Sequence, residues 1–179
     1  MRTRMLTLLA LGTLLACADR SNETAVADPT PCTIAGLGIC SEAGNLVIAS
    51  QPSQQVLEYL AAQGYETVVS TRAPDELDWD ERAAVEALGM RFVNIPMPGP
   101  VEAITDEQVA AFAEVMESGE GRMFLHCGSG NRVAGLWGAW LAEYRGIDSA
   151  EALRLAELGG MTRVRPVVEQ RLGALAVER

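Results

Sequence analysis

The sequence predicts a single α/β domain, with a central, mostly parallel sheet of about four to five strands flanked by helices. Three observations lead to this fold class. Short apolar or β-branched segments alternate with longer segments whose apolar residues recur at helical spacing. Helix-capping residues, glycines and prolines separate the segments. The chain has 179 residues, 49% of them hydrophobic, which suits one domain with a substantial core.

Four segments are expected to be strands because they are short, apolar and rich in residues that favour a pleated, half-buried surface. Longer segments with helical spacing lie between them, so the strands should run parallel and be joined by right-handed crossovers. The predicted strands are Leu46–Ala49, Thr67–Thr71, Arg91–Ile95 and Arg122–His126.

Six segments are expected to be helices covering both faces of the sheet. Ser53 is placed to cap the first helix, and Thr105 with Gln108 has the pattern of a capping box at the start of the third. The fourth is the most apolar and follows the last strand almost directly. The predicted helices are 53–64, 79–88, 105–117, 133–144, 149–158 and 166–177.

The composition excludes several kinds of chemistry. All 14 basic residues are arginines, so a phosphate loop or a Schiff base that needs lysine is ruled out. His126 is the only histidine, which rules out a zinc site built on several histidines. We expect no metal and no cofactor. The net charge of -10 argues against a nucleic-acid partner and favours a small anionic substrate over a polyanion.

The N-terminus has the pattern of an export signal. Arg2 and Arg4 precede an apolar stretch, 5–16, that is too short to span a bilayer. The stretch ends in Leu-Leu-Ala followed by Cys17, which resembles the lipidation site of bacterial lipoproteins; a plain signal peptide is the alternative. We therefore expect a signal peptide at 1–16, a tether at 17–35 and a domain at 36–179. Cys17 would anchor the exported domain to a membrane, with the domain in the periplasm.

Two further cysteines enclose a short loop. Cys32 and Cys40 could form a disulfide in an oxidising compartment, or remain two free surface thiols. Cys127 then has no partner.

The strongest candidate site lies where the last predicted strand runs into the most apolar helix. Cys127 ends that strand, and Arg132 precedes the helix. Backbone N-H groups at a helix start, with the positive end of the helix dipole, form an anion site that would stabilise a thiolate. Arg132 can grip two oxygens of a bound oxyanion, and Ser129 can donate a hydrogen bond.

The other residues of this loop have supporting roles in the prediction. Gly128 and Gly130 let the loop curl so that its N-H groups point inward, and Asn131 completes the binding set. His126 is expected to orient the loop by hydrogen bonding. Two other interpretations are a dinucleotide-binding motif, which fails because Val133 replaces the third glycine, and a buried structural cysteine.

His126, Cys127, Gly130 and Arg132 resemble the loop of protein tyrosine and dual-specificity phosphatases, in which His-Cys is followed by an arginine. The closer resemblance is to the bacterial group of beta-lactamase-hydrolase-like, phosphatase-like domains. It implies a phosphatase-like fold and hydrolysis of a phosphoester through a thiophosphate on Cys127. The resemblance covers about residues 45–144 and is carried by 49–53, 71–75, 94–96, 127–132 and 136–137.

One departure from that family leaves alternatives open. Only four residues separate Cys127 from Arg132, where ordinary tyrosine phosphatases have five. Four is the spacing of rhodanese-type sulfurtransferases, so sulfur transfer through a Cys127 persulfide is the first alternative. A non-catalytic oxyanion-binding module is the second.

A phosphatase also needs a general acid to protonate the leaving oxygen. The phosphatase family usually supplies an aspartate from the loop corresponding to 97–102, which holds none here. Glu102 is the predicted acid, and Asp75, Asp78 and Asp106 are the alternatives. Arg72 is expected to pair with Asp75 or Glu76 and less so to bind an anion.

Overall fold

The computed structural model describes residues 26–118 and 121–178, so the predicted signal peptide and the lipidation site Cys17 lie outside the described residues. The strands are β1 (Thr30–Pro31), β2 (Cys40–Ala43), β3 (Leu46–Ala49), β4 (Tyr65–Ser70), β5 (Arg91–Asn94) and β6 (Arg122–His126). The helices are α1 (Gln54–Ala62), α2 (Glu81–Ala87), α3 (Asp106–Ser118), α4 (Asn131–Tyr144), α5 (Ser149–Leu158) and α6 (Arg165–Glu178), with a 3-10 turn at Pro74–Glu76.

The six strands form one sheet in the order β1-β2-β3-β6-β4-β5. The four strands β3, β6, β4 and β5 are parallel, which confirms the predicted fold class. The sequence missed β1 and β2, which add an antiparallel edge to β3. β2 is Cys-Ser-Glu-Ala, without a β-branched residue, and β1 is only two residues long, Thr-Pro, so neither has the pattern typical of strands.

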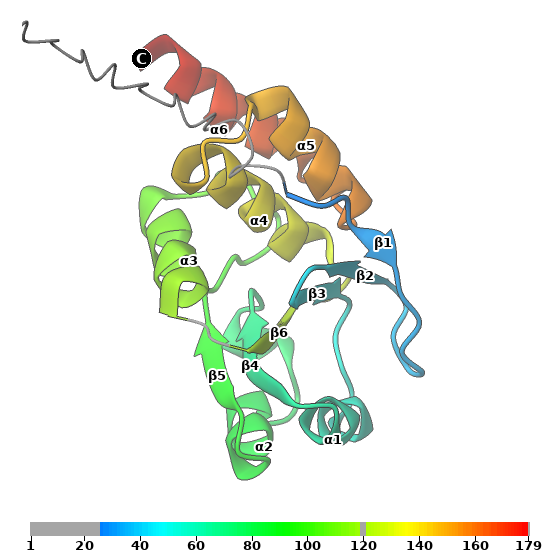
Figure 1. Cartoon of the computed structure of the whole chain (residues 1–179). Coiled ribbons are helices and arrows are strands. Elements are labelled where there is room, and N and C mark those ends of the chain that lie inside the picture. The colour runs from blue at the N-terminus through cyan, green and yellow to red at the C-terminus, as the bar shows by residue number, and fades with distance from the viewer. Residues whose placement is uncertain (1–25, 119–120, 179) are drawn as a thin grey trace, which may run out of the picture.

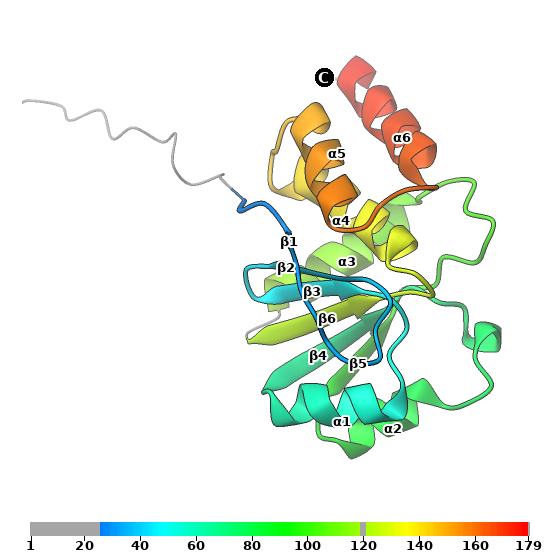
Figure 2. The same ribbon diagram turned by 90° about the vertical axis from the view of Figure 1, so that its right-hand side faces the viewer.

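Helices cover both faces of this sheet. As Figure 2 shows, α1 and α2 lie against one face, and α3 to α6 form a thicker layer on the other. Two groups of buried apolar residues correspond to the two interfaces, the larger one being on the α4 side. Side chains on a strand alternate between faces, so neighbouring residues of β6 face different helix layers.

Helix α4 is the centre of the thicker layer, and α3, α5 and α6 surround it (Figure 1). Eleven of its 14 residues are buried. Gly135 permits a close approach, because a Cβ atom there would lie 2.7 Å from Val164 Cγ2, just before α6, and Gly138 permits an equally close approach of Ala156 in α5. The chain around Val164 is therefore packed directly on α4.

The predicted helix starts agree with the structure in two places and differ in a third. The Ser53 side chain caps α1 by accepting from Val56 N. Thr105 and Gln108 form the predicted capping box, with backbone-to-side-chain distances of 2.9 Å and 3.3 Å. Helix α2 begins at Glu81, two residues later than predicted, because Asp80 caps it.

The segment before β2 is part of the fold, which corrects the predicted tether. Thr30–Pro31 pairs with β2, although 17–35 was expected to be a linker. Cys32 and Cys40 form the predicted disulfide, with a Cα–Cα distance of 5.1 Å. Residues 38 and 39 inside its loop donate backbone N-H groups to Ser50 Oγ, at 2.9 and 3.3 Å. The disulfide loop is thus fastened to the residue that follows β3.

Within residues 26–118 and 121–178, no helix has the length and apolar character needed to cross a membrane. The same residues hold no cluster of three or more His, Cys, Asp or Glu side chains arranged to bind a metal ion.

Candidate active site

The candidate site lies at the carboxyl ends of the parallel strands. β6 is paired with β3 on one side and β4 on the other, with His126 in register with Ala49 and Ser70. The residues that follow these strands therefore meet at one edge of the sheet. In open α/β sheets this edge, beside the central strands, is where ligands bind.

The loop from Cys127 to Arg132 turns directly from β6 into α4. Gly130 caps the helix with a φ of +79°, a left-handed conformation that favours glycine. A Cβ atom there would also lie 3.4 Å from the carbonyl oxygen of Ala49. The first helical hydrogen bond joins Ala134 N to Gly130 O. The N-H groups of the first turn therefore have no partner within the helix and face the loop, as an anion cradle requires.

Cys127 stands at the base of this loop. Its side chain is 1% exposed and packs with the core on the α4 side of the sheet. The residues after it line a cavity of about 700 Å³ together with the 3-10 turn and the chain around residues 98–101. The structure thus brings Cys127 and a solvent-accessible loop together, with the sulfur beneath the loop and not on the open surface.

Arg132 is held by a carboxylate from a distant part of the chain. Its Nη1 and Nη2 each donate to one oxygen of Glu76 at 2.6 Å, and Nη1 also donates to the Met97 carbonyl at 2.6 Å. Those bonds lower the pKa of Glu76 to about 2. Glu76 likewise raises the pKa of Arg132, and the adjacent Cys127 raises it further. This pair is a charged, bidentate one at neutral pH.

The guanidinium also folds back over the loop. A Cβ atom on Gly128 would lie 3.8 Å from Arg132 Nη2. Arg132 Nη2 therefore lies beside the Cys127–Arg132 loop, with Glu76 as the fixed partner of the guanidinium.

Arg72 has a structural role, as expected. Its Nη1 donates to Gln51 Oε1 at 3.0 Å, and its Nε lies 3.4 Å from Glu76 Oε2. It also donates to the backbone carbonyl of Glu76. Arg72 thereby fixes the 3-10 turn that presents Glu76 to Arg132.

His126, expected to orient the loop by hydrogen bonding, does not line the cavity. The side chain is fully buried on the α2 side of the sheet, because it precedes Cys127 by one residue on a strand. Its Nε2 lies 3.2 Å from Glu81 Oε1, in a geometry that makes no hydrogen bond. Burial lowers the pKa of His126 to about 3 and raises the pKa of Glu81.

Asn131 is among the residues that line the cavity. It is largely buried, and its Oδ1 accepts three hydrogen bonds. The donors are Thr162 N at 2.7 Å, Thr162 Oγ1 at 3.1 Å and Val164 N at 3.3 Å. The side-chain oxygen therefore holds the segment before α6 in place.

Glu102, the predicted general acid, lies away from the cavity. It is exposed and lines a separate pocket between the start of α3 and α6, with Arg171 among its neighbours. The chain leaves the site after Val101, so the residue next along it already faces elsewhere. Asp75, weighed as an alternative, does line the cavity.

Two residues of the cavity were not anticipated there. Glu76 was considered as a partner for Arg72, but its distance of 56 residues from Arg132 hid the second contact. Arg163 lines the cavity mouth from the segment that Asn131 holds. Its sequence neighbourhood, Thr-Arg-Val-Arg, carries no signal of a site.

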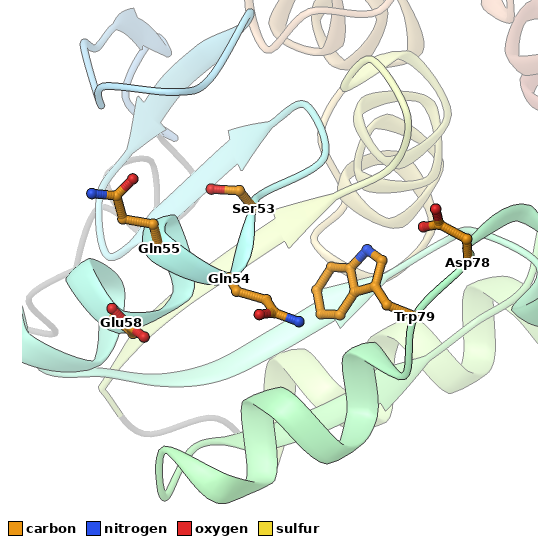
Figure 3. A pocket seen from close by; sticks show the side chains of 6 residues that line it. All are labelled: Ser53, Gln54, Gln55, Glu58, Asp78 and Trp79. Carbon is orange, nitrogen blue, oxygen red and sulfur yellow. The ribbon is translucent and has the colours of Figure 1, made fainter.

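A second hollow, of about 680 Å³, lies between the start of α1 and the chain before α2 (Figure 3). Figure 3 shows the Trp79 ring pointing toward α1. The residues that line it carry no positive charge, in contrast to the arginines around the Cys127–Arg132 loop. They are Ser53, Gln54, Gln55, Glu58, Asp78 and Trp79. A small anion is therefore better accommodated at the loop than in this hollow.

Comparison with known proteins supports a relation to phosphatases. Residues 41–166 match the protein family described as DSP-PTPase phosphatase fused to NAD+ kinase. The beta-lactamase hydrolase-like protein of Agrobacterium fabrum is 34% identical over 97 residues, which is 51% of this chain. The chain covers only 22% of the length of that relative. The resemblance predicted from the sequence is confirmed.

Solved structures share the fold. Tk-PTP in its active form superposes with a TM-score of 0.60 at 24% identity, over 72% of this chain and 91% of that one. A variant of P. aeruginosa TpbA in complex with pTyr gives a TM-score of 0.54 at 19% identity, over 76% of this chain and 90% of that one. At these identities the matches establish the architecture.

Proposed function

The chain belongs to the DSP-PTPase phosphatase family described above, and from this premise we propose that it hydrolyses phosphomonoesters with Cys127 as the nucleophile. The observation that supports the proposal most directly is the arrangement of the Cys127–Arg132 loop. A cysteine at a strand end, a helix N-terminus with free N-H groups and an arginine folded back over the loop lie together where β6 turns into α4. The pTyr complex of TpbA shows that a protein of this fold accepts a phosphorylated aromatic group.

The first step in this proposal is attack of the Cys127 thiolate on phosphorus. An S–P bond forms, the P–O bond to the leaving group breaks, and the thiophosphate stays on the enzyme. The loop N-H groups and Arg132 stabilise the charge that develops on the phosphoryl oxygens. Glu76 keeps the guanidinium oriented, because both of its oxygens bind the two Nη atoms.

A proton must reach the leaving oxygen during that step. Asp75 is the best-placed donor, since it lines the cavity and makes no ion pair among the described residues. Glu76 is unsuited to this role because Arg132 holds its pKa at about 2. In the second step the Asp75 carboxylate takes a proton from water, the water oxygen attacks phosphorus, and the Cys127 thiolate leaves.

The test is hydrolysis of 4-nitrophenyl phosphate and of an alkyl phosphate by the whole exported chain. Cys127→Ser should lower kcat at least about a thousandfold on both. Asp75→Asn should lower kcat more for the alkyl ester, whose leaving oxygen needs the proton, and Glu102→Gln is the matched control. Equal effects of Asp75→Asn and Glu102→Gln would contradict the assignment of the acid.

The four-residue spacing of the loop specifically favours a second candidate, sulfur transfer. Thiosulfate would give its outer sulfur to the Cys127 thiolate, forming a persulfide and releasing sulfite, and cyanide would then take the sulfur as thiocyanate. Intact-mass measurement separates the two candidates, because a persulfide adds one sulfur to Cys127 and a thiophosphate adds a phosphoryl group. Binding of phosphate without either adduct would indicate a non-catalytic oxyanion-binding module.

We also propose that the protein is exported and anchored through Cys17 in the periplasm. The signal-like segment 1–16 supports this, as does the Cys32–Cys40 disulfide, a bond typical of oxidising compartments. Cys17→Ser should shift the protein from the membrane fraction to the soluble fraction. A variant that stays with the membrane would overturn the anchor.

A further inference from the structure

We propose that Arg163 forms a second anion-binding position at the mouth of the cavity and selects phosphomonoesters that carry another anionic group. The inference rests on the proposed phosphatase function and names the substrate class for the same site. No sequence pattern singles out this arginine, and its importance comes from where the fold places it.

The charges lining the cavity make Arg163 distinctive. Two arginines line it, Arg132 and Arg163. Arg132 already binds both oxygens of Glu76, while Arg163 has no carboxylate within 4 Å among the residues that the structure describes. The lining also includes Asp75, whose carboxylate repels a second anion near it. An additional negative group on a substrate is therefore attracted to the Arg163 side of the mouth.

Arg163 is also held firmly at its backbone. The residues on either side of it are fixed to the nucleophile loop by Asn131 Oδ1, which accepts from Thr162 N and Val164 N. Val164 is 5% exposed and packs against the surface of α4 that Gly135 leaves open. A loop residue and the helix behind it thus set the distance between Arg163 and the phosphate cradle. Such a fixed separation is what selection for a ligand with two anionic groups requires.

The partner group is defined by chemistry, because a guanidinium binds carboxylates and phosphates alike. The expected substrate is a small molecule or peptide side chain with one phosphomonoester and one further carboxylate or phosphate. The net charge of the chain, -10, opposes long polyanions at a distance, which favours a compact ligand of this kind.

The experiment compares three substrates with the full chain: 4-carboxyphenyl phosphate, its neutral amide 4-carbamoylphenyl phosphate, and 1,4-phenylene bisphosphate. For the wild type, kcat/KM should be higher for the two doubly anionic esters. Arg163→Ala should reduce the anionic-to-neutral ratio of kcat/KM about fivefold, since an exposed ion pair has an energy of this order. The loss should appear in KM, because the second group is remote from the reacting phosphorus.

Two further variants complete the design. Arg163→Glu should reduce the ratio further, and Arg163→Lys should restore part of it. Arg91→Ala is the matched control, because Arg91 is an exposed arginine at the first residue of β5, at the opposite end of the parallel strands. The effect of Arg163→Ala should shrink at 1 M salt, where the Debye length falls to about 3 Å.

The outcomes separate this inference from the function on which it rests. Hydrolysis of the neutral amide with an unchanged ratio in Arg163→Ala would overturn the inference alone. An equal loss on all three substrates would show that Arg163 only maintains the loop, and would also overturn it. No turnover of any of the three by the wild type would overturn the proposed function and this inference with it. A preference for the carboxylate or for the bisphosphate identifies the second group.

Discussion

His126 and Cys127 are neighbours on β6, yet each faces a different layer of the fold. On the Cys127 side, Arg132 and Glu76 form a bidentate pair with side chains 13% and 28% exposed. On the His126 side, His126 and Glu81 approach to 3.2 Å with side chains 0% and 4% exposed. Both places set a basic group against a glutamate. They differ in access to water and in the geometry of contact.

That difference determines the charge of each pair. On the Cys127 side, two charge-assisted hydrogen bonds hold the pKa of Glu76 at about 2, so the Arg132–Glu76 pair is ionised. On the His126 side, burial lowers the pKa of His126 to about 3 and raises the pKa of Glu81. His126 is thus neutral at physiological pH. An arginine paired with a glutamate therefore supplies an electrostatic clamp on one face, whereas the histidine beside a glutamate on the other face is a neutral polar group.

The largest expected effect comes from removing the cation of the Arg132–Glu76 pair. Arg132→Ala should lower kcat/KM for an aryl phosphate about a thousandfold, because the oxyanion loses its clamp. Arg132→Lys keeps the charge but cannot bind two oxygens in the same plane, so it should recover only a small part of the rate. Steady-state kinetics with 4-nitrophenyl phosphate measure both variants. Full activity of Arg132→Lys would show that the bidentate geometry is unimportant.

The second-largest effect is on stability and concerns the His126–Glu81 pair. Glu81→Ala should reduce the free energy of unfolding by about 2 kcal/mol, because it leaves Gln51, which donates to Glu81 Oε1 at 2.6 Å, without its buried acceptor. Glu81→Gln keeps an acceptor oxygen and should lose at most half as much. Urea unfolding at pH 7 gives both values. An equal loss in the two variants would mean that Glu81 acts there through its charge, as Glu76 does on the Cys127 side.

The two faces also differ in how far the sequence predicts them. The path from β6 through the Cys127–Arg132 loop into α4 follows from local pattern, so strand, loop and helix were all expected. The partners of that loop come from residues far along the chain. Glu76 reaches Arg132 only because the turn after β4 lies beside the end of β6, which no local spacing reveals.

Some roles of site residues depend on how a side chain is oriented, which the sequence pattern does not specify. His126 and Asn131 are in the expected places, but strand alternation directs one side chain to the far face and three hydrogen bonds direct the other to residues 162–164. Glu102 was chosen by nearness in sequence, and the chain turns away just before it. Strands β1 and β2 were missed because tertiary pairing, of β2 with β3 and of β1 with β2, stabilises them in spite of weak strand propensity.

A third effect is a change in the pH dependence of the free energy of unfolding, caused by His126. Between pH 6.5 and about 3 the unfolded chain binds a proton on histidine that the folded chain does not, so stability should fall as the pH falls through this range. The His126→Asn variant should lack this fall, which urea unfolding at pH 7 and pH 4 measures. In the untagged protein, the only histidine resonances should also show no titration between pH 8 and 5. A midpoint near 6.5 would place His126 in contact with water.

The smallest effect belongs to Glu76 and appears in a lower pH range. Its folded pKa of about 2 lies below the ordinary 4.5, so its stabilisation is complete above pH 4.5 and disappears as the pH falls toward 2. Because the pair is partly open to water, we expect a contribution of about 1 kcal/mol. Urea unfolding should show Glu76→Gln less stable than the wild type at pH 6 and equal to it near pH 2. If the stability difference between Glu76→Gln and the wild type grew on acidification, the charged Arg132–Glu76 pair would be refuted.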